Sequence, residues 1–353
     1  MTAAEPAVRF VPLAQPEDAF PGARPYQTLS SWMAVWEGTA RTGFRRHGIE
    51  HDGERVGEFS HAVLTSRLFG RRLISMPFSD GSGLFLHPGK ADDPRLVRAV
   101  LDGLAGFLDR QAEAHDLDYV ELRGDPLLAV LEGGFVRREP YVSFILDLSG
   151  GYERVRRGYS GNIVENLRKA DRSADVSEGG AGDFSEDLYR IYLAQMRKFG
   201  SPPLPIGYFS GLLACGLARV YTARVAGRVT GFLMVLVQGG RMSAEINASL
   251  GAFDSHFPKV RLFDHAIRSA CLEGLAEFDF MRTRRDSGVY LHKKKWGGRE
   301  VPIPYFFRVR RGGVPAVSDA AQRRYLLPRL FFACAPASVA SRLGPRVRSW
   351  IGK

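Results

Sequence analysis

The chain has 353 residues, of which 45% are hydrophobic and 25% are charged, and its pI is about 9.8. This composition is typical of a folded protein of roughly two domains, and it excludes a wholly disordered chain. The 49 basic residues exceed the 38 acidic residues by 11, an excess that favours polyanionic partners such as nucleic acid, an anionic membrane or phosphate-bearing substrates.

The first half of the chain alternates helices and strands. A Ser-capped helix is predicted for 30–42, and a long helix for 94–116 carries Leu96, Val100, Leu104 and Leu108 on one face. Strands are predicted for 45–50 and 54–66, which are joined at Asp52-Gly53, and for 71–78, 119–122 and 141–148.

A second unit begins near residue 150. Its predicted helices are 152–173, 187–199 and 261–274, and a stiff proline loop covers 200–205. Its predicted strands are 218–225, 229–238, 241–249, 277–280 and 301–310, with a basic tract at 290–298 before the last strand. Because both halves share one order of elements, we expect a duplicated α/β unit with mixed, largely antiparallel sheets flanked by helices. No GxGxxG follows a first strand and no Walker loop occurs, so nothing supports a dinucleotide-binding or P-loop protein.

The cysteines and the chain start indicate a reducing compartment. Cys215, Cys271 and Cys334 lie far apart and form no CxxC pair, so neither a disulfide framework nor a zinc ribbon is predicted. His47 and His51 fall in a stretch that we interpret as a turn between strands, and we expect no metal site. No secretory leader is recognisable, and no stretch reaches the roughly 18 apolar residues of a membrane span. We therefore expect a cytoplasmic protein.

Four segments carry a family resemblance: Leu-Phe-Gly-Arg-Arg-Leu-Ile-Ser-Met-Pro-Phe-Ser-Asp at 68–80, Asn-Leu-Arg-Lys-Ala at 166–170, Met-Arg-Lys-Phe-Gly-Ser-Pro-Pro at 196–203, and Asp279-Phe-Met-Arg with Ser287-Gly-Val-Tyr and Lys293-Lys-Lys-Trp-Gly. Together they make the chain, from about residue 30 to 310, similar to the FemAB-like branch of the GNAT superfamily, the group with a BioF2-like acetyltransferase domain. FemAB-like proteins found beside exopolysaccharide and sorting-system genes are particularly similar.

The resemblance implies two tandem GNAT-like domains, here 1–149 and 150–310, followed by a basic amphipathic tail at 311–353. It also implies transfer of an acyl or aminoacyl group to an amine of a cell-envelope, exopolysaccharide or small-molecule precursor. The donor would be a substrate, aminoacyl-tRNA or acyl-CoA, and no bound cofactor is implied. Met281 stands where glycine is usual and His292 where an aromatic residue is usual, and no Arg/Gln-x-x-Gly-x-Gly/Ala loop occurs between Ser249 and Asp264. An acyl-CoA-dependent N-acetyltransferase and a non-catalytic GNAT-fold protein at the membrane surface remain the alternatives.

Three residues are candidates for the chemistry. Amide formation passes through a tetrahedral oxyanion that a fixed cation stabilises, and the resemblance places Lys293 there, with Lys294 as the alternate. In a strand, Lys293 and Lys295 would face one side and Lys294 the other. Asp80, in a Ser/Gly loop just past a strand, is the candidate base for the attacking amine.

Further residues are candidates for substrate binding. Glu245 and Asn247 are two apart and are expected on one face of a strand, where they would line the cleft or form a polar edge. Arg168 and Lys169 would bind a substrate phosphate or tRNA backbone, or form a solvated basic face. The C-terminal motif adds Asp279, Arg282, Ser287, Gly288, Tyr290 and Trp296, of which Tyr290 and Trp296 could equally be core residues.

The tail combines basic and apolar residues without an acidic one. Between Ala321 and Lys353 there are seven basic residues, interleaved with leucines and aromatics and divided by Pro328, Pro336 and Pro345. This pattern is typical of a helix in a membrane interface, here the inner face of the plasma membrane, and the alternative is a tail packed back on the first domain. Residues 308–353 supply +9 of the net charge and the preceding 307 residues only +2, which favours a membrane surface over tRNA.

Overall fold

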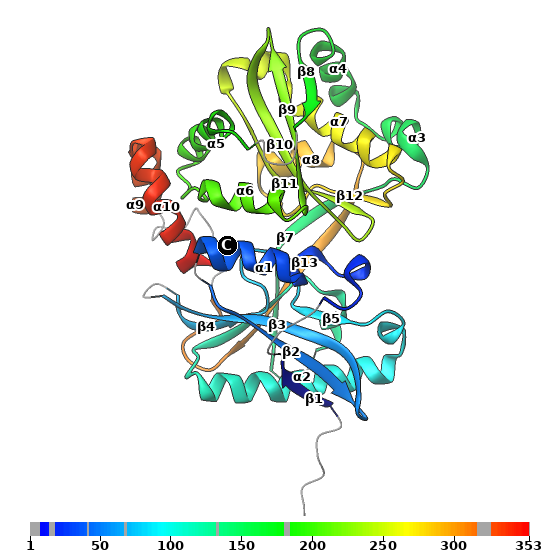
Figure 1. The fold of residues 1–353 in the computed structure, drawn as a ribbon, viewed down its shortest axis with the longest axis vertical. Coiled ribbons are helices and arrows are strands. Elements are labelled where there is room, and N and C mark those ends of the chain that lie inside the picture. The colour runs from blue at the N-terminus through cyan, green and yellow to red at the C-terminus, as the bar shows by residue number, and fades with distance from the viewer. Residues whose placement is uncertain are drawn as a thin grey trace, which may run out of the picture. The chain divides into compact units, whose positions relative to one another are not determined.

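The computed structural model describes residues 8–13, 18–40, 42–66, 69–131, 134–179, 184–315 and 326–352. The chain forms two compact units: unit 1 comprises 1–140, 303–317 and 349–353, and unit 2 comprises 141–302 and 318–348. The chain therefore passes between units within strands β7 (Val136–Asp147) and β13 (Arg299–Val309) and again within helix α10 (Ala337–Ile351). Figure 1 labels these elements.

Unit 1 is built on a sheet with the strand order β1-β2-β3-β4-β6-β13, and β5 pairs with β3. Only β4 and β6 run parallel among its described strands, and the long helix α2 (Pro94–Ala114) lies between them in the sequence. Helix α1 is Ser30–Ala40. The strands are β1 (Val8–Pro12), β2 (Phe44–His51), β3 (Glu54–Ser66), β4 (Gly70–Ile74), β5 (Leu84–Leu86) and β6 (Tyr119–Arg123).

Helix α2 shows why the sequence of unit 1 folds as predicted. Asp93 caps the helix by accepting hydrogen bonds from the backbone N–H groups of Arg95 and Leu96, and Pro94 suits the first turn. The predicted apolar face is buried in the core of unit 1, where Val100, Leu104 and Leu108 have no exposed surface. Burial of this face holds α2 on the sheet.

Unit 2 has the strand order β7-β12-β11-β10-β9-β8, and among its described strands only β11 (Arg241–Ser249) and β12 (Glu277–Asp279) pair in parallel. Helix α7 (Pro258–Leu272) connects that pair. The remaining strands are β8 (Asp175–Glu178), β9 (Ala218–Val225) and β10 (Arg228–Gln238). Each unit thus has one parallel pair whose connection contains a long helix, as the duplicated order of elements predicted.

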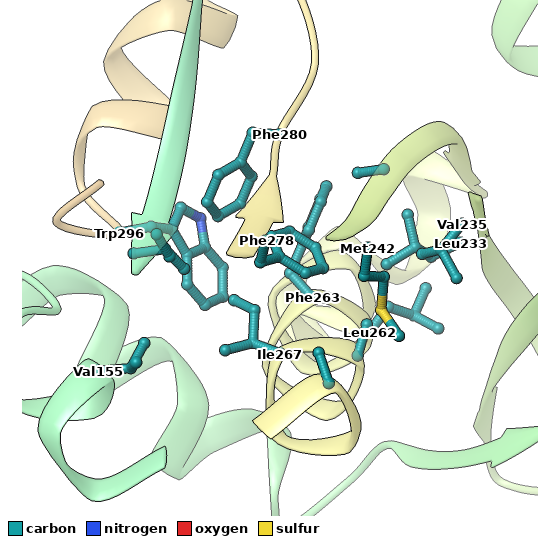
Figure 2. Packing of buried hydrophobic residues seen from close by; sticks show 14 of the residues in the cluster. Val155, Leu233, Val235, Met242, Leu262, Phe263, Ile267, Phe278, Phe280 and Trp296 are labelled. Carbon is teal, nitrogen blue, oxygen red and sulfur yellow. The ribbon is translucent and has the colours of Figure 1, made fainter. Parts of the chain in front are cut away.

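The sheet of unit 2 has a core on each face. Figure 2 shows the α7 side, where Phe263 and Trp296 pack with Phe278, Phe280 and residues of β10 and β11. On the other side are helices α5 (Glu186–Phe199) and α6 (Ile206–Ala214). There Phe209 of α6 packs with Tyr192 of α5 and with Phe184, which in turn contacts Phe232 of β10. Phe232 and Leu233 are neighbours on β10, so their side chains point to opposite faces.

The α/β class with mixed, largely antiparallel sheets is confirmed, and several local predictions are wrong. The predicted helix 152–173 is two helices, α3 (Gly151–Arg157) and α4 (Gly161–Ala170), because the chain turns at Gly158 and Ser160 caps α4. The His47–His51 stretch belongs to strand β2, and the turn follows at Asp52-Gly53. Strand β8 and helix α6 were not predicted.

The described part of the tail folds as two helices, α9 (Leu326–Cys334) and α10, which Pro336 separates. Pro328 lies in the first turn of α9, where proline is tolerated, and Pro345 lies inside α10. Residues 326–348 belong to unit 2, and 349–352 belong to unit 1. Residues 321–325 and 353 of the predicted tail, and Leu68 of the first motif, lie outside the described residues. No helix in the described ranges is long and apolar enough to span a bilayer.

Candidate active site

The parallel strands of unit 2 end at different points along their shared direction. Their register pairs Arg241 with Glu277 and Ser243 with Asp279, but β12 stops there while β11 continues to Ser249. The carboxyl ends of parallel strands are a common place for ligands in α/β proteins. The end of β11, the start of α7 and the segment after β12 therefore define the candidate site.

A strained turn leaves β12. Met281 has a φ of 60°, a left-handed conformation that favours glycine. Its N–H donates to Asp279 Oδ1 at 2.7 Å, and Lys293 Nζ donates to the carbonyls of Met281 at 2.8 Å and Arg282 at 3.0 Å. The turn is thus held on both sides by buried charged side chains.

Asp279 is part of the same network. Ser143 Oγ donates to its Oδ1, and Arg241 Nη1 lies 3.7 Å from its Oδ2. Burial raises the pKa of this carboxyl group, while its hydrogen bonds and the nearby cations oppose that shift. The predicted site residue Asp279 therefore holds the backbone of the loop.

Lys293 lies on a helix, so the strand geometry considered for the lysine tract is wrong. Helix α8 (Gly288–Lys294) begins because Ser287 Oγ accepts from the N–H of Tyr290 at 3.2 Å. Helical spacing then buries Lys293, which is 8% exposed, and leaves Lys294 and Lys295 on the surface. Lys294 Nζ lies 5.9 Å from the ring of Tyr290.

Glu245 occupies a β-bulge that the sequence did not reveal. Ile246 pairs with Met234 and Ala244 with Val235, so Glu245 is the extra residue of β11. Its Oε1 accepts a hydrogen bond from Tyr208 of α6 at 2.6 Å. Bulges often occur beside active sites, where they reorient a side chain.

The bulge also places the side chains of Glu245 and Asn247 on opposite faces of the sheet. Asn247 pairs with Leu233, which belongs to the core on the α7 side, whereas Glu245 bonds to α6 on the other face. The expectation that the two side chains share one face is wrong, because an inserted residue shifts the alternation by one. The Asn247 carbonyl accepts from Gln195 Nε2 of α5 at 2.7 Å.

Positive charge collects around His292. Its pKa is lowered to about 4, chiefly by burial and also by repulsion from Lys259, Lys295 and Lys293. Lys259, at the start of α7, has its own pKa lowered by burial. Sequence analysis missed Lys259, whose only signal was its place after Pro258 at the first turn of a helix.

Residues 159–294 match the sequence family described as the acetyltransferase (GNAT) domain. This segment is therefore similar to GNAT acetyltransferase domains. It contains Glu245, Lys259, Asp279 and Lys293, and it confirms the FemAB-like resemblance seen in the sequence. No curated protein sequence matches this chain.

Solved structures show the same fold. FemX is similar with a TM-score of 0.64 and 14% identity over 82% of this chain and 94% of its own. A tandem GNAT protein from the clavulanic acid biosynthesis pathway has a TM-score of 0.53 and 15% identity, over 87% of this chain and 100% of its own. A C-terminal domain assigned to a lysylphosphatidylglycerol synthetase of Agrobacterium fabrum has a TM-score of 0.50 and 13% identity, over 79% of this chain and 87% of its own. At these identities the likeness concerns the fold alone, which is two tandem GNAT-like units.

The remaining motif residues lie in or beside the GNAT domain with local partners. Tyr290 donates to Glu300 Oε2 at 2.7 Å, and its ring centroid lies 5.2 Å from that of Phe144. Arg282 lies over the ring of Tyr141 at 5.4 Å. Gly288 opens α8 with open space beside it. Trp296 is fully buried, and its ring lies near those of Phe263 and Phe280 (Figure 2). It also contacts Tyr159, so it acts as a core residue.

Two predicted groups have other partners than the residues of this turn. Arg168 and Lys169, at the end of α4, are exposed and face Glu165 at 3.9 and 3.4 Å, which fits the solvated-face interpretation. Asp80 belongs to unit 1, where Tyr305 Oη donates to its Oδ1 at 3.3 Å. In the described residues, no group of three or more His, Cys, Asp or Glu side chains could hold a metal ion.

Proposed function

We propose that this protein is an N-acyltransferase that moves an acyl or aminoacyl group from an ester or thioester donor to an amine. The observation that carries the proposal is the end of the β11/β12 pair in a GNAT domain, where the bulged Glu245 lies on a strand that outruns its partner. The amine nitrogen attacks the carbonyl carbon, the C–O or C–S bond breaks, and an amide forms. The released hydroxyl or thiol takes one proton.

Glu245 supplies the base in this proposal. An amine attacks only in its neutral form, so a carboxylate near it must accept a proton. Glu245 is half-buried, is oriented by Tyr208, and extends from the bulge. Asp80 remains a second candidate from unit 1. The oxyanion role of Lys293 or Lys294 stays a prediction, and the contacts of Lys293 support a positioning role for it.

The lysines around His292 would attract the donor. Aminoacyl-tRNA and acyl-CoA both carry phosphates, which Lys259 and Lys295 favour by charge. The resemblance to FemAB-like proteins supports the tRNA donor and a peptidoglycan or other envelope acceptor in the cytoplasm. The tandem GNAT neighbour, whose name mentions AcCoA, supports acyl-CoA as the alternative.

A donor screen tests the proposal. The full chain is incubated with labelled aminoacyl-tRNAs and, separately, with labelled acyl-CoAs, together with envelope precursors and simple amines. We expect amide product from one donor class, and Lys259→Ala should raise the KM for that donor several-fold while Lys169→Ala does not. Absence of product from both classes would contradict the enzyme hypothesis and favour a non-catalytic binding protein.

A further inference from the structure

Helix α9 has an apolar face that the described part of the chain leaves exposed. Leu326 and Leu330 are each 53% exposed, Leu327 is 77% exposed and Phe331 is 44% exposed. At 100° per residue these four side chains span an arc of about 140°. Phe332, which is 3% exposed, lies outside that arc and packs inward with Ala335 and Ala340. One side of the helix therefore packs on unit 2, and the opposite, apolar side is exposed to solvent.

Helix α10 continues this pattern within unit 2. Ala340 and Gly344 are buried, whereas Val339 and Leu343 are each 38% exposed. Arg342 and Arg346 are exposed beside them. Residues 326–352 contain no Asp or Glu, so no acidic side chain within these helices offsets the arginines.

Contacts to α5 and to the loop that follows it fix the orientation of α9 and α10. Arg197 Nε donates to the Ala333 carbonyl at 3.0 Å, and Arg348 Nε donates to the Pro202 carbonyl at 2.8 Å. A groove of about 270 Å³ lies between α5 and the two helices. Phe199, at the end of α5, is a further exposed aromatic residue, at 48%, and Figure 1 shows α9 and α10 beside α5. The exposed face is thus a fixed surface of unit 2.

We propose that the outer face of α9 and α10 binds the surface of an anionic lipid bilayer. Exposed leucines and a phenylalanine gain free energy by entering the acyl region, and flanking arginines are attracted to anionic headgroups. A nucleic acid would meet the arginines but would leave the apolar arc in water. The nine residues of α9 are too few to cross a bilayer, so the helix would lie in its surface. This proposal is independent of the transferase activity.

Vesicle co-sedimentation of the full chain tests the proposal. We expect binding to vesicles of phosphatidylcholine with phosphatidylglycerol, weak binding to phosphatidylcholine alone, and release by salt. Leu327→Ser with Leu330→Ser, and separately Arg342→Gln with Arg346→Gln, should each weaken binding about tenfold or more. The matched control is Leu272→Ser on α7, which removes a leucine that is 79% exposed elsewhere in unit 2. Because all these side chains are exposed, their thermal unfolding should match that of the parent chain.

Cysteine labelling places the bilayer on the surface. Cys334 lies in the exposed arc of α9, and Cys215 is exposed after α6. A polarity-sensitive fluorophore on Cys334, in a Cys215→Ser background, should shift to the blue with anionic vesicles, whereas a fluorophore on Cys215, in a Cys334→Ser background, should not. Equal shifts at both cysteines, no vesicle binding, or self-association of the chain that Leu327→Ser with Leu330→Ser abolishes without vesicles would each overturn the proposal.

Discussion

At the scale of single residues, the contacts of Lys293 in the turn after β12 allow its catalytic role to be distinguished from a structural one. Lys293→Met keeps the aliphatic stem but removes the donors to the Met281 and Arg282 carbonyls. We expect a loss of about 2 kcal/mol in the free energy of unfolding, because charged donors to buried carbonyls contribute that much. Urea denaturation measures this loss, and Lys294→Met, on the exposed neighbour, is the control. Unchanged stability with abolished transfer would instead support the oxyanion role.

Met281 provides a second test of the same turn. Glycine adopts a φ of 60° without the strain of a side chain, so Met281→Gly should stabilise the Lys293→Met variant by up to about 1 kcal/mol. FemAB-like sequences usually have glycine where this chain has Met281. The left-handed backbone at this position explains why glycine would be favoured there. A lower urea midpoint in the double variant than in Lys293→Met would contradict this explanation.

Two histidines predict acid sensitivity of unit 1. His61 is fully buried, and its ring centroid lies 5.2 Å from that of His47. Neither ring nitrogen of His61 has a hydrogen-bond partner among the residues that the structure describes. Burial lowers the pKa of His47 to about 4 from the ordinary 6.5, and lowers that of His61 well below 6.5. Between pH 6.5 and 4 the unfolded chain therefore binds more protons, and stability falls as the pH falls.

From pH 6.5 to 5 the lowered pKa of His47 should cost about 1.5 kcal/mol of stability, and the lowered pKa of His61 should add to that loss. Urea midpoints at pH 7.5 and 5 measure this effect, and His61→Phe should reduce the pH dependence. His51→Gln, at the half-buried end of the strand that carries His47, serves as the control. Equal pH dependence in His61→Phe and the parent chain would contradict the assignment.

At the scale of elements, the bulge in β11 gives Glu245 its proposed role. Glu245→Gln keeps the Tyr208 hydrogen bond but removes the base, so we expect kcat to fall by about 100-fold or more with little change in KM. The loss should shrink at alkaline pH, where the acceptor amine is already neutral. Tyr208→Phe should have a smaller effect, since it only loosens the orientation of Glu245. A pH-independent loss would assign Glu245 to binding.

The elements that the sequence predicts best are those with an uninterrupted pattern. Alternating residues and tight turns predicted β9, β10 and β11 almost to the residue, and the capped apolar face predicted α2. Helix α6 was missed because two glycines and a preceding proline mask its apolar character. The basic tract was ambiguous because the Ser287 cap, not hydrophobic periodicity, starts α8.

The candidate site was only partly predictable for a similar reason. Motif resemblance found Asp279 and Lys293, which lie together because β12 and α8 are close in sequence. The bulge at Glu245 depends on pairing between β10 and β11, and the charge around His292 depends on how α7 and α8 pack. Neither the bulge nor this cluster of charge produces a pattern in the local sequence, so both could be recognised only in the structure.

At the scale of the whole molecule, the net charge is concentrated near the end of the chain. Residues 308–353 supply +9 of the net +11, and the preceding residues are nearly neutral. Four arginines of this segment lie on α9 and α10, where they accompany exposed leucines. The basic pI is therefore better explained by the proposed bilayer surface than by a nucleic-acid site in the body.

Residues 350–352 have a structural role in unit 1 that a deletion would expose. Arg72 Nη2 donates to the carbonyls of Trp350 at 2.7 Å and Ile351 at 2.9 Å, and Arg123 Nη1 donates to that of Gly352 at 3.2 Å. Both arginines are at most 1% exposed. Deleting the tail would therefore remove partners of two buried charges, which is why point substitutions test the bilayer surface more cleanly.

We expect a chain that ends at Arg348 to lose about 3 kcal/mol of unfolding free energy, because the buried guanidinium of Arg72 would lose two carbonyl acceptors. Arg123 would lose one acceptor but would keep Glu121 and the Ser79 carbonyl. Thermal unfolding measures this, with a chain that lacks only Lys353 as the control. Adding Arg72→Leu to the truncated chain should restore part of the loss, since the buried charge is then removed with its partners. The same substitution in the full chain should destabilise. If truncation leaves the unfolding temperature unchanged, residues 350–352 are not part of the fold of unit 1.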